Sequence, residues 1–172
     1  KITNKHNLPE ALAQACLNFM FAHPPEPGRI SVTELAKPPQ IRHLEAKHWD
    51  DIEEDVIDRL WAVFGTVAHK ILEDHTPDNA LSEEKLTLVL NGVQLRGTAD
   101  LYEPPANLSD WKVTSVYAVR EVKAEWEAQL NSYAVLYRRA GFSVEKLTIH
   151  AILRDWSRSA ARRACWACPI RA

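Results

Sequence analysis

The segment Lys85-Leu-Thr-Leu-Val-Leu-Asn-Gly-Val-Gln-Leu-Arg-Gly-Thr-Ala-Asp-Leu-Tyr102 decides the fold, because it has the pattern of a β-hairpin. At its centre is Asn91-Gly92, the dipeptide that best supplies positive φ at both central positions of a two-residue turn. Apolar, strand-forming residues flank this dipeptide on both sides. We therefore predict two antiparallel strands, over residues 85–90 and 93–102.

Helical periodicity precedes the hairpin. Apolar residues recur at helical spacing from Ile52 to Ile71, and acidic residues crowd the start of this stretch. The pattern predicts one long amphipathic helix from about Asp50 to Asp74. A shorter helix is predicted earlier, over residues 9–21, before a proline-rich connector.

Three further elements follow the hairpin. Residues 110–116 alternate and are rich in β-branched side chains, which is typical of a strand. A helix is predicted from Lys123 to Ala140, ending before Gly141, a usual residue just past a helix end. Residues 146–154 alternate again and predict a last strand.

The element order α-β-β-β-α-β predicts an α/β fold, in which helices flank a mixed β-sheet. We divide the chain into an N-terminal lead-in packed on the core (residues 1–49), the core itself (50–156) and a basic C-terminal tail (157–172).

Composition narrows the class of protein. Among 172 residues, 46% are hydrophobic and 26% are charged, which suits a globular domain and not a disordered chain. Three cysteines do not make a disulfide scaffold, and no apolar run is long enough to span a bilayer. We expect a reducing, cytoplasmic location and no membrane contact.

Charge is unevenly distributed, although the net charge is only −2. Residues 44–110 hold five Lys/Arg and fifteen Asp/Glu, whereas residues 120–172 hold ten Lys/Arg and five Asp/Glu. A basic C-terminal part could contact phosphates, while the acidic centre would repel them unless cations lay between. This asymmetry fits a metal-dependent enzyme of nucleic acids, or else two ordinary solvated surfaces.

A candidate site lies on the strands. Alternation places Asp110 and Lys112 on one face, and a neighbouring strand can bring Asp100 beside them. Converging carboxylates repel one another unless a cation intervenes, and oxygen ligands suit Mg²⁺ or Mn²⁺. Taken alone, the pattern Asp-x-Lys favours a surface salt bridge.

Two helices offer further polar groups. His69 lies one turn after Gly65 in the first long helix and could be a metal ligand, or simply a packed histidine. Gln129 and Tyr133 stand four residues apart on one face of the second long helix. Their amide and phenol could bind phosphate or a base, or form the polar rim of a half-buried helix.

The ordered motifs Gly65-Thr-Val-Ala-His69, Gly97-Thr-Ala-Asp100, Asp110-Trp-Lys112 and Gln129-x-x-x-Tyr133 resemble the PD-(D/E)xK nuclease superfamily, in its RecB-like exonuclease branch. The resemblance implies a restriction-endonuclease-like core. It also implies one or two Mg²⁺ or Mn²⁺ ions on His69, Asp100, Asp110 and the backbone carbonyl of Trp111, with Lys112 as the catalytic lysine. Gln129 and Tyr133 would support the site and the DNA.

From this resemblance we expect a metal-dependent DNA exonuclease of recombination, repair or phage DNA processing, in a bacterial cell or a phage-infected host. DNA is the expected partner, together with a possible recombination or single-strand-binding protein. A structure-specific endonuclease and an inactive DNA-binding module of the same fold remain alternatives. A small interaction domain that binds zinc through Cys165-x-x-Cys168 is a third.

Several other residues are weaker candidates. Glu73 follows His69 by one helical turn and could bind a second ion or pair with Lys70. Thr114 and Ser115 could bind phosphate or be ordinary strand hydroxyls. Basic residues near the C-terminus could contact the DNA backbone or only solvent, namely Arg154, Arg158, Arg162 and Arg163.

Some RecB-like nucleases carry an iron–sulfur cluster on four cysteines. This chain has Cys165, Cys168 and Cys16, and Cys16 falls in a different segment from the early cysteine of those relatives. Because the set is incomplete, we expect no iron–sulfur cluster, and zinc has no better support.

Overall fold

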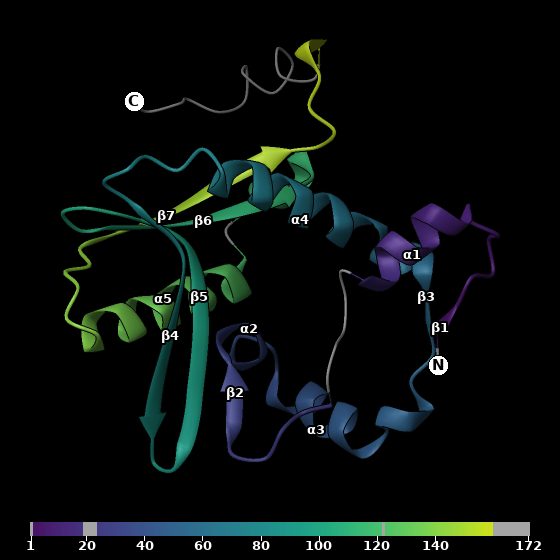
Figure 1. Ribbon diagram of the computed structural model, residues 1–172, viewed down its shortest axis with the longest axis horizontal. Coiled ribbons are helices and arrows are strands. Elements are labelled where there is room, and N and C mark those ends of the chain that lie inside the picture. Colours follow the sequence, from purple (N-terminus) through teal and green to yellow (C-terminus); the bar gives the residue numbers. More distant parts are fainter. Residues whose placement is uncertain (1, 19–23, 122, 160–172) are drawn as a thin grey trace.

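A mixed β-sheet with helices on both faces forms the body of the molecule in the computed structural model, which describes residues 2–18, 24–121 and 123–159 (Figure 1). The elements in chain order are β1 (Ile2–Thr3), α1 (Glu10–Asn18), β2 (Arg29–Ser31), α2 (Val32–Leu35), α3 (Pro39–Lys47), η1 (Trp49–Asp51), β3 (Glu54–Asp55), η2 (Val56–Arg59), α4 (Leu60–Glu73), β4 (Leu81–Leu90), β5 (Val93–Glu103), β6 (Asn107–Thr114), η3 (Val116–Val119), α5 (Ala124–Arg139) and β7 (Lys146–Leu153). The elements named η are 3₁₀ helices.

The predicted hairpin is confirmed. β4 and β5 pair in antiparallel fashion, and the Leu90–Val93 pair closes the turn. Asn91 and Gly92 both have positive φ, +50° and +80°, as a two-residue turn of this kind requires. β4 begins at Leu81, four residues before the predicted start, so the hairpin is longer than its apolar pattern indicated.

The sheet is mixed because β5 has different neighbours along its two edges. β4 occupies one edge; on the other edge β2 pairs in parallel with residues 94–96, and β6 pairs in antiparallel fashion with residues 101–103. β7 then pairs in parallel with β6 along all eight residues, and α5 makes the crossover between them. The predicted order of elements and the mixed sheet flanked by helices are therefore confirmed.

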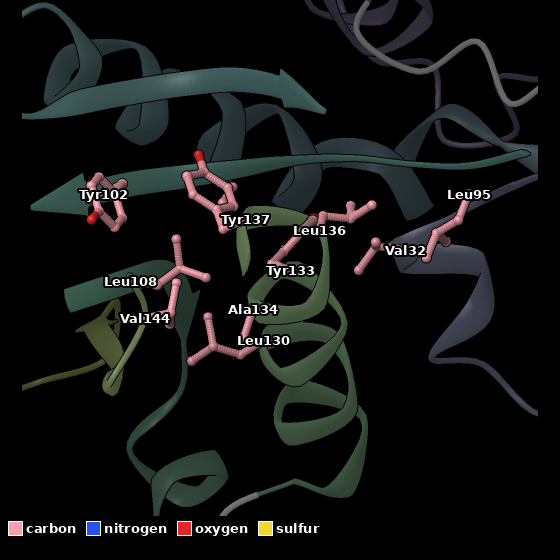
Figure 2. Close-up of a cluster of buried hydrophobic side chains, with 11 residues drawn as sticks. Val32, Leu95, Tyr102, Leu108, Leu130, Tyr133, Ala134, Leu136, Tyr137 and Val144 are labelled. Atoms are coloured by element: carbon pink, nitrogen blue, oxygen red, sulfur yellow. The ribbon is translucent and has the colours of Figure 1, made fainter. Parts of the chain in front are cut away.

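The main hydrophobic core lies between the sheet and α5. Figure 2 shows side chains of α5 directed toward the strands, with Tyr137 beside Tyr102 and Leu130 below Leu108 and Val144. Tyr102 and Tyr137 stack with ring centroids 5.5 Å apart. The helix approaches β5 so closely at Gly97 that a Cβ there would lie 2.7 Å from a ring carbon of Tyr133. α5 is thus held firmly against the middle of β5.

The other face of the sheet carries α4, which contacts β6. Its side chains meet residues whose alternation directs them away from the α5 core, including Leu101 and Trp111. Four large apolar side chains of α4 stay more than two-fifths exposed, namely Trp61, Phe64, Val67 and Ile71. The sheet therefore lies between α5, which is buried deeply, and α4, which is not.

The predicted helix from Asp50 to Asp74 is wrong over its first ten residues. Only Leu60–Glu73 is α-helical, and Asp55 instead caps the 3₁₀ helix η2. The Asp55 carboxylate also accepts hydrogen bonds from Thr3 Oγ1 at 2.8 Å and from the Lys5 backbone N–H at 2.7 Å. Asp55 thus helps to hold the N-terminal strand β1 against β3 and does not begin the long helix.

Other boundaries differ by a few residues. β6 spans Asn107–Thr114 where residues 110–116 were predicted, because the chain leaves the sheet at Ser115 and enters η3. α5 and β7 agree with their predicted ranges within one residue at each end, and Gly141 has φ +96°, as expected past a helix end. α1 is confirmed over Glu10–Asn18; Pro9 precedes the helix, and residues 19–21 of the predicted range lie outside the described residues.

The N-terminal segment contributes to two places in the molecule. α1 packs its buried Ala13 and Cys16 against Val56 of η2, which forms a small second core at the start of α4. β2, by contrast, extends the main sheet beside β5. None of the helices among the described residues combines the length and the apolar character that crossing a membrane requires.

The contact at Gly97 gives a prediction about stability. Gly97→Ala should lower the free energy of unfolding by about 1–3 kcal/mol, because the new methyl group would overlap Tyr133, Val32 and Leu136 in a packed core. Gly65→Ala is the control, since nothing lies within 4 Å of a Cβ there and the helix interior favours alanine by up to about 1 kcal/mol. Chemical denaturation measures both. Equal stability of the two variants would contradict this account of the core.

Candidate metal centre

β5 and β6 separate soon after they begin to pair. Their ladder has only three residue pairs and ends at Leu101 and Ser109. Beyond it, residues 97–100 of β5 and 110–112 of β6 face a gap, which we call the fork. At the fork the Trp111 backbone N–H donates to Asp100 Oδ2 at 2.6 Å, so a side-chain carboxylate takes the place of a strand carbonyl. The divergence of two strands therefore positions the first acidic group.

His69 reaches the fork from α4. Its Nε2 lies 3.1 Å from the Trp111 carbonyl oxygen, and its Nδ1 lies 3.3 Å from Asp100 Oδ1. The hydrogen bond to Asp100 raises the pKa of His69 above its usual value, although burial opposes this. Three of the predicted metal-binding groups, one on each of α4, β5 and β6, thus lie side by side.

Asp110 and Lys112 face the fork from the α5 side of β6. The Asp110 side chain is buried, and Lys112 Nζ lies 2.7 Å from its Oδ2 and 3.0 Å from its Oδ1. Burial raises the pKa of Asp110. The positive charge of Lys112 opposes this rise, and the negative charge of Asp100 adds to it. Asp110 and Lys112 are therefore a close ion pair next to a second carboxylate.

Gln129 and Tyr133 continue this arrangement on α5. Gln129 Oε1 accepts a hydrogen bond from Lys112 Nζ at 3.1 Å, and Gln129 Nε2 lies 3.1 Å from the Tyr133 hydroxyl oxygen. Tyr133 is only 5% exposed and packs at Gly97, so its ring is part of the core. These two residues thus contact the lysine directly, through Gln129, and indirectly, through Tyr133.

A cavity of about 320 Å³ opens on the α4 side of the fork. Its lining includes His69, Glu73, Glu83, Asp100 and Glu103, so carboxylates dominate its charge. Trp111 and His150 form one wall, with ring centroids stacked 4.4 Å apart. The cavity is large enough for a phosphate group, but an anion would enter it only beside a bound cation.

The remaining candidate residues lie in three different places around the fork. Glu73 lines the cavity and pairs with Lys70 at 3.0 Å. Thr114 is buried at the end of β6 and Ser115 begins the turn into η3, both past Lys112 in the chain. The Arg154 guanidinium lies over the exposed Trp61 ring, 4.2 Å from its centroid.

Other candidates have no visible link to the site. Arg158 is exposed beyond β7. Cys16 is buried in the small N-terminal core. Arg162, Arg163, Cys165 and Cys168 lie outside the described residues.

Glu83 on β4 is a residue that the sequence analysis missed. One ligand atom from each of His69, Glu83 and Asp100 can be chosen so that all three lie within 4.8 Å of one another. The sequence did contain a signal for it, because counting both strands back from the Asn91-Gly92 turn places residue 83 opposite residue 100. The predicted strand began at residue 85, too late to include it.

The donor set fits a divalent cation. Carboxylate oxygens, a carbonyl oxygen and an imidazole nitrogen suit Mg²⁺ and, with the imidazole, Mn²⁺. Burial, together with the negative charge of Asp100, raises the pKa of Asp110, and a cation bound nearby would oppose both effects. Of the predicted ligands, His69, Asp100 and the Trp111 carbonyl lie together, whereas Asp110 is paired with Lys112 beside them.

Comparison with known proteins supports the fold alone. No protein-family model matches the chain, and no curated protein matches it. A solved structure entitled "Crystal structure of SSO0001" is similar with a TM-score of 0.63 and 22% sequence identity, over 86% of this chain and 72% of that one. At a sequence identity this low, the comparison shows a similar arrangement of helices and strands and nothing more.

The Asp110–Lys112 pair gives a second prediction about stability. Without added metal, Lys112→Met should lower the free energy of unfolding by about 2–3 kcal/mol, because it leaves a buried carboxylate without its cation. This loss of stability is smaller than is usual when a fully buried ion pair is broken, because the Lys112 side chain is 21% exposed. The double variant Asp110→Asn/Lys112→Met should recover part of the loss, since no charge then stays buried. Denaturant titration of both variants checks this. If the two substitutions changed the free energy of unfolding additively, this account would be refuted.

Proposed function

We propose that this protein is a metal-dependent deoxyribonuclease of the PD-(D/E)xK superfamily, in its RecB-like branch, and that it acts as an exonuclease. The observation that carries the proposal is the fork itself. There His69, Asp100 and the Trp111 carbonyl lie together, with the Asp110–Lys112 pair adjacent. These are the groups that the ordered sequence motifs implied, and they come from three separate segments of the chain, α4, β5 and β6.

Each group has a distinct role in this proposal. A Mg²⁺ or Mn²⁺ ion on His69, Asp100, Asp110 and the Trp111 carbonyl would polarise the phosphate and acidify a water molecule. Lys112 is held by Asp110 and Gln129, and its remaining N–H donor would orient the attacking water or stabilise charge on the phosphate. Tyr133, through Gln129, fixes the position of that lysine.

The distribution of charge supports a phosphodiester substrate. The cavity carboxylates repel phosphate unless a cation is bound, so turnover should depend strictly on the metal. Arg154 and the exposed Trp61 form a cation–π pair on the α4 side, where a nucleic-acid backbone and a base could bind. Recombination, repair or phage DNA processing is the proposed setting, with a recombination or single-strand-binding protein as the proposed partner.

The first experiment incubates the protein with end-labelled linear DNA and with closed circular DNA, each single-stranded and duplex, in Mn²⁺. An exonuclease should degrade linear molecules and leave circles intact. Cleavage of circles would favour the structure-specific endonuclease, and binding without cleavage would favour the inactive DNA-binding module. Calcium should support DNA binding without turnover, because it accepts looser and higher coordination.

Two substitutions test the catalytic assignment. Asp110→Asn and Lys112→Met should each lower the rate of DNA degradation in Mn²⁺ by at least about 100-fold, because each removes a group that acts on the reacting phosphate. Lys85→Ala, on the exposed part of β4, is the matched control and should cleave like the wild type. Circular dichroism establishes that each variant is folded under assay conditions. Wild-type turnover by either site variant would refute the assignment.

A further substitution tests the DNA path. Arg154→Gln should raise KM for DNA, leave kcat unchanged and reduce the salt dependence of binding by about one counterion, as expected for one lost phosphate contact. Arg139→Gln, at the exposed end of α5, should change neither quantity. Binding isotherms at several salt concentrations measure the slope. An unchanged slope in Arg154→Gln would exclude this residue from the DNA path.

A further inference from the structure

Glu83 occupies an unusual position in the hairpin. The pairs Ser82–Leu101 and Glu84–Ala99 flank it, so its register partner on β5 is Asp100. Its φ of +52° is uncommon for a residue other than glycine and interrupts the regular strand. The alternation of β5 breaks at the same level, because Ala99 and Tyr102 both belong to the core next to α5. The carboxylates of Glu83 and Asp100, on neighbouring strands, thus both lie where the regular pleat of the hairpin is interrupted.

The Glu83 side chain faces the fork and not bulk solvent alone. It is half-buried, it lines the cavity, and a carboxylate oxygen lies within 4.8 Å of a ligand atom of both His69 and Asp100. Burial and the neighbouring charge of Asp100 raise the pKa of Glu83. The arrangement places like charges side by side at an electrostatic cost.

The other acidic groups of the fork have strong partners, and Glu83 does not. Asp100 accepts the Trp111 N–H, Asp110 pairs with Lys112, and Glu73 pairs with Lys70. Within the described part of the chain, no hydrogen bond or ion pair holds the Glu83 carboxylate. The nearby positive charges of His69 and Lys70 only partly offset the burial of Glu83 and its repulsion by Asp100.

We propose that Glu83 is a metal ligand, and that it binds a divalent cation of the Mg²⁺ or Mn²⁺ class together with His69 and Asp100. Two carboxylates and one imidazole are a suitable donor set for such an ion, and the imidazole favours Mn²⁺ over Ca²⁺. This assigns to β4 a ligand that none of the sequence motifs contains. The inference rests on the proposed function, since the ion is the one that the nuclease would use, but it can be measured without DNA.

The first test is calorimetric titration of the full chain, freed of metal by chelation, with MnCl₂. Glu83→Gln keeps size and backbone preference but removes the charge, and it should weaken Mn²⁺ binding by at least about tenfold. Glu84→Gln is the matched control on the neighbouring exposed position, and it should bind like the wild type. Wild-type Mn²⁺ affinity in Glu83→Gln would overturn the proposal, as would the same loss in both variants.

Thermal unfolding gives a second readout that does not depend on activity. In chelator, Glu83→Gln should melt a few degrees above the wild type, because an uncompensated charge beside Asp100 has been removed. In MnCl₂ the order should reverse, because the wild type gains more from the ion. A wild type that is more stable than Glu83→Gln even in chelator would show that Glu83 has a structural role and would overturn the proposal.

The two hypotheses fail in different ways. If the wild type cleaves DNA and Glu83→Gln binds Mn²⁺ normally, the nuclease stands and the role of Glu83 is wrong. If Mn²⁺ binding depends on Glu83 but no DNA is cleaved, the metal site stands and the nuclease is wrong. A wild type that binds no Mn²⁺ overturns both.

Discussion

The separation of β5 from β6 after three residue pairs is the constraint on which the candidate site depends. Strands that stay paired satisfy their backbone groups with one another, whereas diverging strands leave these groups facing a gap. Here the Trp111 N–H turns to the Asp100 carboxylate and the Trp111 carbonyl meets His69. The same gap lets side chains from both faces of the sheet approach one another, which a continuous ladder would prevent.

The helices on the two faces of the sheet add polar groups to those that the strands supply at the fork. α5 packs closely at Gly97 and projects Gln129 toward Lys112, so the position of the lysine is tied to the main core. α4 supplies His69 from the opposite face, although much of its apolar surface is exposed. Rigidity is thus greatest on the α5 side, where the Asp110–Lys112 pair lies, and this suits a group that must act at a fixed position. The concentration of carboxylates works against folding and is understandable if a cation binds there.

Much of the fold could be predicted because its signals are local. The Asn91-Gly92 turn, the end of α5 before Gly141 and the alternation of β7 depend on residues close in sequence. The start of α4 could not be found in this way. Asp50, Asp51 and Asp55 look like the acidic first turn of a helix, but Asp55 bonds Thr3 and Lys5, which lie about fifty residues earlier. A local pattern cannot reveal a partner so distant.

The amino-acid sequence by itself determined the order of the elements and named His69, Asp100, Asp110 and Lys112 as chemically related. Periodicity and turn preferences depend on a few neighbouring residues, and the order of the motifs can be read directly from the sequence. Only the tertiary structure decided that β2 pairs with the edge of β5, that the fork forms beside it, and that His69 of α4 lies next to Asp100 and the Trp111 carbonyl. These features arise where segments distant in sequence come into contact, and a local sequence pattern does not indicate which distant segment will pack against it.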